Sequence, residues 1–136
     1  MKNILLPIDG SARSLRTIQM VKRTYTPAQV RLTILMVLPG QMHIDGELAI
    51  QRAKEKAQED LAGFARMLEG YNVQTDFRRV SPGPEIVHYA QEKGFDTIIM
   101  TRSSRGPLQR LGSVATYVVK NAPTLDLFIM REAAEE

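Results

Sequence analysis

A chain of 136 residues with 43% hydrophobic and 24% charged residues is long enough to bury one core, and we expect a single domain over residues 1–136. The net charge of +3 is mild and there is no tryptophan, so the sequence lacks the interleaved basic and aromatic residues that binding single-stranded nucleic acid requires. With no cysteine, no apolar run of membrane-spanning length and no signal-peptide pattern, it predicts a cytoplasmic protein without disulfides, zinc ribbons or membrane contact.

Strand-like and helix-like segments alternate along the chain. In order, the pattern predicts a strand at 3–8, a helix capped by the Asp9-Gly10-Ser11 turn, a strand at 30–38, a long helix at 47–69, a strand at 73–80, a helix after a rigid turn at 81–84, a strand at 97–100, a helix that begins at Ser113, and a strand at 125–130. Leu15, Ile18 and Val21 are predicted to form the inner face of the first helix.

This alternation predicts an α/β fold. Right-handed crossovers between successive strands require a parallel sheet with helices on both faces. We therefore expect an open, doubly wound, Rossmann-like sheet of five strands in the order 3-2-1-4-5, with two helices on each face. The polar alternation of 73–80 places that strand near an edge, and the apolar strand at 3–8 is expected beside the one at 97–100.

A basic loop follows the fourth predicted strand and leads into the last helix. Such a loop lies where an open α/β sheet binds ligands, and its backbone N–H groups and arginines, among them Arg102 and Arg105, favour an anion. Asp9 ends the neighbouring first strand and is expected to face this loop across the crevice. Asp9 has two interpretations that are compatible with each other, a helix cap and a ligand contact.

Several segments, taken in order, resemble the universal stress protein family over nearly the whole chain. They are Pro7-Ile8-Asp9-Gly10-Ser11, Leu32-Thr33-Ile34-Leu35-Met36-Val37, Phe95-Asp96-Thr97-Ile98-Ile99-Met100, Gly106-Pro107-Leu108, Leu111-Gly112-Ser113-Val114-Ala115 and Asn121-Ala122-Pro123. The resemblance implies a stress-response module with an adenine nucleotide, ATP, between the ends of strands 1 and 4, and Mg²⁺ only together with that nucleotide.

The resemblance also implies roles for single residues. Asp9 would contact base and ribose, Val37 the adenine, and Gly112, Ser113 and Val114 the phosphates. The full predicted cofactor-binding set is Pro7, Asp9, Val37, Arg102, Ser104, Arg105, Gly106, Gly112, Ser113 and Val114. The chain departs from the ATP-binding pattern at Thr101 and Ser104, which stand where that pattern has glycine, and Gly106 is a candidate substitute for a missing glycine.

Two functions are consistent with these residues. One is a non-enzymatic regulatory module that binds an adenine nucleotide, with slow ATP hydrolysis left open; the other is an interaction module whose loop is collapsed and holds no nucleotide.

Neither His43 nor His88 has a second ligand at metal spacing, so we expect no resident metal. We expect a homodimer through the apolar last strand, by pairing of Leu125, Leu127, Phe128, Ile129 and Met130 with the same residues of a second copy.

Overall fold

A computed structural model of the protein describes residues 1–38, 46–102 and 113–131. Strands and helices alternate along it as the sequence predicts. They are β1 (Lys2–Ile8), α1 (Ala12–Thr24), β2 (Val30–Leu38), α2 (Glu47–Met67), β3 (Asn72–Arg79), α3 (Pro82–Glu92), β4 (Thr97–Thr101), α4 (Ser113–Asn121) and β5 (Asp126–Met130), with a short 3₁₀ helix at Pro27–Gln29 before β2.

The five strands form one parallel sheet in the order β3-β2-β1-β4-β5, which confirms the predicted topology. β1 lies at the centre because Ile4, Leu5 and Leu6 are fully buried, as expected for a strand covered on both faces. It pairs with β2 along its whole length and with β4 through Ile4 and Leu5. The direction of winding therefore reverses between β1 and β4.

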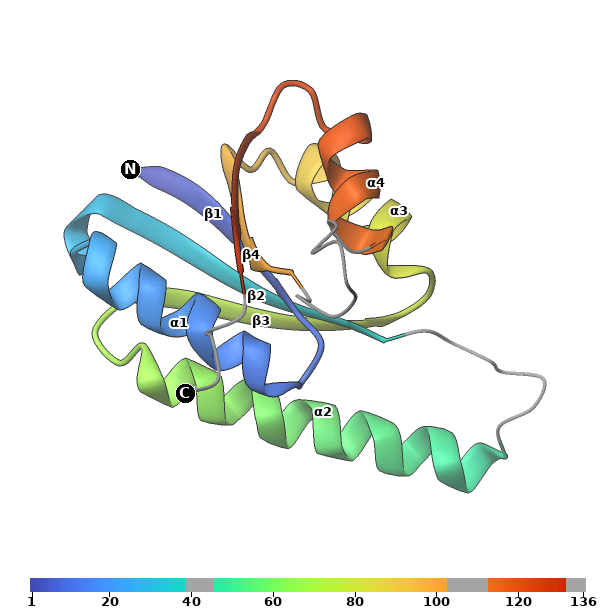
Figure 1. Ribbon diagram of the computed structural model, residues 1–136. Coiled ribbons are helices and arrows are strands. Elements are labelled where there is room, and N and C mark those ends of the chain that lie inside the picture. The colour runs from blue at the N-terminus through green and yellow to red at the C-terminus, as the bar shows by residue number, and fades with distance from the viewer. Residues whose placement is uncertain (39–45, 103–112, 132–136) are drawn as a thin grey trace.

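Two helices cover each face of the sheet (Figure 1). α1 and α2 pack on one face, where Ile18, Val21 and Leu61 join the apolar side chains of β1 and β2 in one core. α3 and α4 pack on the other face, where Ile86 and Val118 belong to a second core. The edge strands, β3 and β5, contain no fully buried residue, in agreement with their outer positions.

The structure corrects the predicted inner face of the first helix. Leu15 is 37% exposed, whereas Ser14 and Thr17 are buried with Ile18 and Val21. The reason is local: Ser14 and Thr17 face polar partners at the carboxyl ends of β1 and β4, and therefore occupy buried positions without an unsatisfied hydroxyl. Apolar spacing alone favoured Leu15 over its polar neighbour and was wrong.

Smaller corrections concern element ends. The predicted turn at 81–84 is the first turn of α3, because Ser81 takes the N-cap position and Pro82 the first helical position, where its missing N–H costs nothing. α2 ends at Met67 instead of residue 69, and β5 begins at Asp126 instead of residue 125. These shifts leave the order and packing of the elements unchanged.

Candidate functional site

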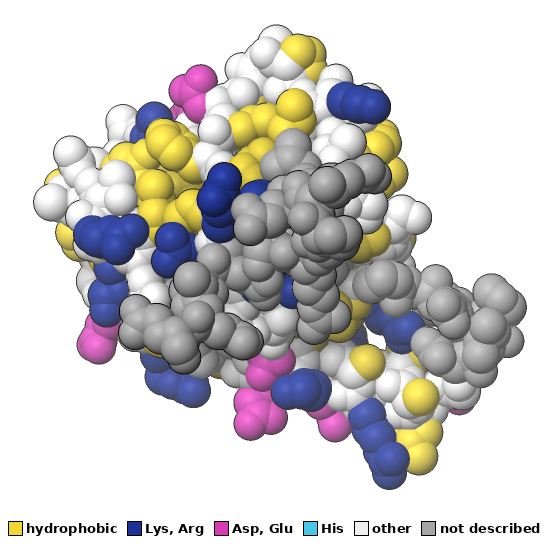
Figure 2. All heavy atoms as spheres, viewed as in Figure 1, with side chains coloured by type: hydrophobic (Ala, Val, Ile, Leu, Met, Phe, Trp, Pro, Cys, Tyr) yellow, Lys and Arg dark blue, Asp and Glu magenta, His cyan; other side chains and the backbone are white. Residues whose placement is uncertain are grey.

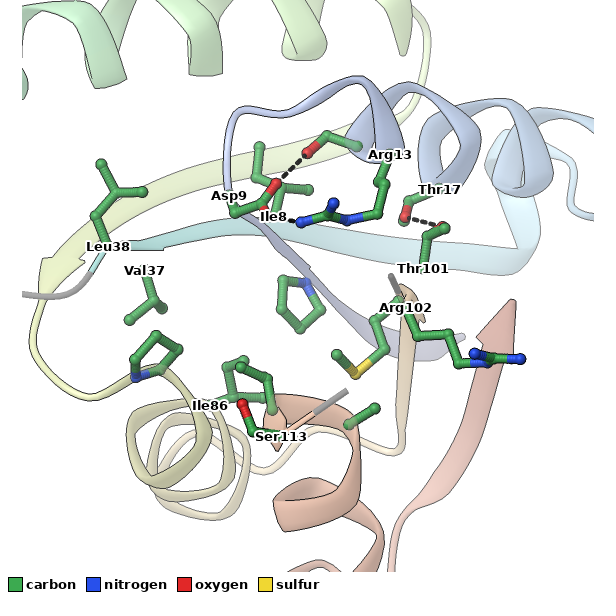
Figure 3. Close-up of a pocket in the computed structure, with 16 residues that line it drawn as sticks. Ile8, Asp9, Arg13, Thr17, Val37, Leu38, Ile86, Thr101, Arg102 and Ser113 are labelled. Carbon is green, nitrogen blue, oxygen red and sulfur yellow. Dashed lines mark hydrogen bonds and ion pairs between the residues drawn. The ribbon is translucent and has the colours of Figure 1, made fainter. Parts of the chain in front are cut away.

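A cleft of about 330 Å³ opens at the carboxyl ends of β1, β2 and β4 (Figure 3). Its walls are the first turns of α1 on one side and the amino ends of α3 and α4 on the other. This is the position where the winding of the sheet reverses, and strand ends separate there because the helices that follow leave in opposite directions. The volume is at the lower end of the range for small-molecule sites.

The structure brings the described members of the predicted binding set together in this cleft. Pro7, Asp9, Val37, Arg102, Ser113 and Val114 all line it, although they come from β1, β2, α4 and the segments that follow β1 and β4. The remaining members, Ser104, Arg105, Gly106 and Gly112, lie outside the described residues. That these side chains bind a ligand stays a prediction.

Asp9 is held in a tight turn between β1 and α1. Its Oδ1 accepts hydrogen bonds from the Ser11 backbone N–H at 2.9 Å and from the Ser11 hydroxyl, and its Oδ2 accepts one from Arg13 Nη2 at 2.5 Å. Gly10 permits the turn because its φ of 80° is one that residues with a Cβ rarely adopt. Ser11 occupies the N-cap position of α1, but its hydroxyl donates to Asp9 instead of capping the helix, so the side-chain cap expected from the sequence is not formed.

The surroundings of Asp9 favour its charged form. Partial burial raises the pKa of the carboxyl, but the hydrogen bonds from Ser11 and the nearby Arg13 guanidinium outweigh this effect and hold the pKa below its ordinary value. Asp9 therefore carries its negative charge throughout the physiological pH range. A charged carboxylate can accept hydrogen bonds from hydroxyl or amine groups of a ligand.

Sequence reasoning missed Arg13, Thr17 and the contact of Thr17 with Thr101. Arg13 forms an ion pair with Asp9, four residues before it, from the first turn of α1. The Thr17 and Thr101 hydroxyl oxygens are 2.9 Å apart, and this hydrogen bond joins α1 to the end of β4. Arg13 and Thr17 are four residues apart and lie on one face of α1, and this spacing was the available signal.

Arg102 lines the cleft, and its role in binding stays a prediction. Its side chain is buried, with 8% of the residue exposed, and its backbone N–H donates to the Met130 carbonyl oxygen at 2.8 Å. Figure 3 shows the Arg102 guanidinium directed away from the cleft, whereas the Arg13 guanidinium reaches from α1 toward Asp9 along one side of the cleft. The positive charge that faces the cleft from the described residues thus comes from α1 and not from the end of β4.

The wall opposite Asp9 is mostly apolar. Ile86 from α3 and Met100 from β4 line it, together with Val37 at the end of β2. α4 can approach α3 closely because Gly83 has no side chain: a Cβ there would lie 3.0 Å from two atoms of the Tyr117 ring and its stem. An apolar wall facing a charged pair suits a ligand with one flat apolar part and one polar part.

The cleft has few groups suited to metal or acid–base chemistry. Among the described residues that line it, Asp9 is the only carboxylate, and it is already engaged by Ser11 and Arg13. Over residues 1–38, 46–102 and 113–131, no group of three or more histidine or acidic side chains is arranged to hold a metal ion. Within the same ranges, no helix combines the length and the hydrophobicity needed to cross a membrane.

An open parallel sheet with a ligand-sized cleft at its switch point defines a Rossmann-like α/β domain. Comparison with known proteins narrows this class. The model described as the universal stress protein family matches residues 1–129, and the chain belongs to that family. It is 34% identical, over 133 aligned residues, to the universal stress protein MJ0531 of Methanocaldococcus jannaschii, with 89% of this chain and 77% of the relative covered.

Solved structures agree with the fold. The structure of the hypothetical protein MJ0577 has 26% sequence identity and a TM-score of 0.83, with 98% of each chain covered. A universal stress protein family protein from Arabidopsis thaliana, determined with AMP bound, has 12% identity and a TM-score of 0.74, covering 98% of this chain and 94% of that one. At 12% identity the second likeness concerns the fold alone.

Proposed function

We propose that this protein is a non-enzymatic regulatory module of the stress response whose cleft binds an adenine nucleotide. The observation that carries the proposal is the convergence of Asp9, Val37, Ser113 and Val114 on one cleft of about 330 Å³ at the switch point of the sheet. The Arabidopsis protein of the same family was determined with AMP bound, so a member of this family can take a ligand of this class.

The two sides of the cleft suit the two ends of such a ligand. Val37, Ile86 and Met100 offer an apolar surface for the purine ring. On the other side, Asp9 Oδ1 already accepts hydrogen bonds from Ser11 in the turn. The ribose hydroxyls would therefore donate hydrogen bonds to Asp9 Oδ2. Ser113 and Val114 begin α4, where backbone N–H groups lack helical partners and attract phosphate oxygens.

A binding role is favoured over catalysis by the same residues. The single carboxylate of the described lining is already bonded to Ser11 and Arg13, so it is poorly placed to activate water or to hold Mg²⁺ without the help of phosphate oxygens. Mg²⁺ is therefore proposed only as a companion of the nucleotide. The cytoplasmic location stays a prediction from the sequence, which leaves slow ATP hydrolysis open.

The competing proposal is an interaction module that takes no nucleotide. Thr101 favours it, because this residue stands where ATP-binding members have glycine and its hydroxyl is bonded to Thr17 across the cleft floor. A Cβ at such a position hinders close approach of phosphate oxygens to the backbone. Both proposals share a homodimer formed through β5, whose Phe128 side chain is 41% exposed.

Isothermal titration calorimetry of the full chain with ATP and with AMP separates the two proposals. We expect saturable binding of at least one of them, and a loss of about tenfold or more in affinity for Asp9→Ala, because hydrogen bonds to a charged group are removed. Glu59→Gln is the matched control, since it removes one negative charge from an exposed position of α2. Heat signals for neither nucleotide, together with no nucleotide carried through purification, would establish the interaction module instead.

A further inference from the structure

We propose that Arg13 binds the anionic group of the ligand and thereby makes the cleft prefer a nucleotide to the corresponding nucleoside. This inference rests on the proposed function and deepens it, because it adds a residue of α1 to the backbone N–H groups of α4 that the proposed function assigns to phosphate. The argument has three steps, which concern the direction of the charges at the cleft, the position of Arg13 in its helix and the two oxygens of Asp9.

The first step is the direction of the cationic side chains. Arg13 and Arg102 are the cationic residues among the described lining. Figure 3 shows the Arg102 guanidinium pointing away from the cleft and the Arg13 guanidinium reaching toward Asp9 along one side of the cleft. The Arg13 side chain lines the cleft and is 22% exposed, so a ligand in the cleft can reach it. Arginine in this setting offers a planar fork that suits phosphate oxygens.

The second step is the position of Arg13 within α1. It lies in the first turn of the helix, where the aligned peptide dipoles disfavour positive charge, and this turn contains no acidic residue. The basic residues Lys22 and Arg23 stand in the last turn, where the dipole favours them. The Asp9 carboxylate just before the helix offsets this cost through its ion pair with Arg13, so α1 keeps a cationic side chain at the end that borders the cleft.

The third step concerns the different hydrogen-bond partners of the two carboxylate oxygens of Asp9. Oδ1 belongs to the Ser11 turn, whereas the hydrogen bond recorded for Oδ2 comes from Arg13. A ligand that carries both hydroxyls and a phosphate matches both members of this pair, because its hydroxyls donate to Oδ2 and its phosphate accepts from the guanidinium. A nucleoside matches only the carboxylate. Before ligand binding, the ion pair holds the Arg13 guanidinium beside Asp9 in the lining of the cleft.

A structural role is the competing explanation. If Arg13 only holds the Asp9 carboxylate in place, its loss weakens every ligand that Asp9 contacts by the same factor. If Arg13 binds phosphate, its loss weakens the nucleotide alone. The ratio of two affinities therefore distinguishes the explanations, and a single affinity does not.

The test is calorimetric titration of the full chain with AMP and with adenosine, which share the base and the sugar. The proteins compared are the wild type, Arg13→Gln, Arg13→Met and the control Arg23→Gln, which removes the same charge from the other end of α1. Arg13→Met keeps the aliphatic stem and serves if the glutamine variant does not fold. We expect both Arg13 variants to lose about 10- to 100-fold in AMP affinity, with adenosine affinity changed by less than about threefold.

The outcomes divide cleanly. Selective loss of AMP binding in the Arg13 variants, with Arg23→Gln like the wild type, establishes the proposal. An equal loss for AMP and adenosine, or no loss for either, overturns the assignment of Arg13 but leaves nucleotide binding in place. A wild type that binds neither ligand rejects the proposed function, and the role of Arg13 with it.

Discussion

The two edges of the sheet differ in their chemistry. β3 forms one edge, and its side chains are largely polar, with Asp76, Arg78 and Arg79 near its carboxyl end. β5 forms the other edge, and after Asp126 it is entirely apolar, with Phe128 41% exposed. Figure 2 shows apolar side chains gathered on the face of the molecule that carries β5. Within the part of the chain that the structure describes, each of the two strands has one side without a neighbouring strand.

The polar side chains of the β3 edge form hydrogen bonds and ion pairs within the same chain. Tyr89 of α3 donates a hydrogen bond from its hydroxyl to Asp76 Oδ2 at 2.9 Å, and Arg78 bonds Asp76 Oδ1 at 2.8 Å. Arg78 also lies 3.6 Å from Glu85 and 5.5 Å from the centre of the Tyr89 ring. Charged groups satisfied in this way make β3 a poor partner for a second strand, because pairing there would desolvate them.

The comparison teaches that one edge of a sheet, here β3, can be protected against pairing with a second chain while the other, here β5, is left suited to it. No charged side chain follows Asp126 in β5, and its alternate residues Leu127 and Ile129 pack against the core of α3 and α4. The exposed Phe128 is on the opposite face of the strand, where pairing about a two-fold axis would bury it with its copy. The following experiments address this difference between the edges.

The largest expected effect is on assembly. Phe128→Lys places like charges close together across a two-fold axis, so we expect a dimer of the wild type to become a monomer at micromolar concentration. Thr75→Lys adds the same charge to an exposed position of β3 and should leave the mass unchanged. Sedimentation equilibrium measures both. A monomeric wild type, or a Phe128→Lys variant that stays dimeric, contradicts pairing through β5.

The next effect is on the stability of the β3 edge. Tyr89→Phe keeps the ring, which stacks on Phe95 at a centroid distance of 5.9 Å, but removes the donor to Asp76. We expect the free energy of unfolding to fall by about 1–2 kcal/mol, since the acceptor is charged and partly solvated. Urea denaturation gives the value, with Tyr117→Phe as the control at an exposed ring. Equal effects of the two substitutions would argue against the Asp76 contact.

The smallest effect is a pH dependence at the same edge. Burial, the hydrogen bond to Asp76 and the charge of Asp76 raise the pKa of Tyr89 from 10.0 to about 12. Because the folded protein holds this proton more tightly than the unfolded chain, the stabilisation is complete below pH 10 and is lost as the pH rises through about 12.

Absorbance of tyrosinate tests this directly. The native wild type should show one tyrosine that ionises near pH 12, and this late step should be missing from Tyr89→Phe. A late step that persists in the variant would assign the raised pKa to another tyrosine.

The sequence was sufficient to predict the order of the strands in the sheet because several independent patterns led to the same order. Buried apolar runs marked β1, β2 and β4, polar alternation marked β3 as an edge, and strand–helix alternation left few arrangements. Where apolar spacing competed with local hydrogen bonding, the prediction was wrong. Leu15 was chosen for the inner face of α1, but Ser14 and Thr17 occupy it because their hydroxyls have partners there.

For the candidate site, the sequence indicated which strand ends meet but not how side chains point. Asp9, Val37 and Ser113 were expected together and line one cleft. The direction of the buried Arg102 side chain depends on its tertiary surroundings, which a residue pattern does not contain. Arg13 was overlooked because a basic residue early in a helix resembles an ordinary solvated one until its carboxylate partner is seen.

β1 acquires its two neighbours at different times during synthesis. β2 follows after a single helix, whereas Asp96, whose carboxylate accepts the Asn3 backbone N–H just before β4, lies 93 residues further along the chain. Until β4 is made, one side of an apolar strand that is fully buried at Ile4 and Leu5 has no partner. At roughly 5–20 residues per second, the nascent chain presents this edge for several seconds in every round of translation. The central strand of the finished sheet, β1, thus has an unpaired apolar edge in the growing polypeptide. Chaperones that cover unpaired strand edges would act on it before the cleft forms.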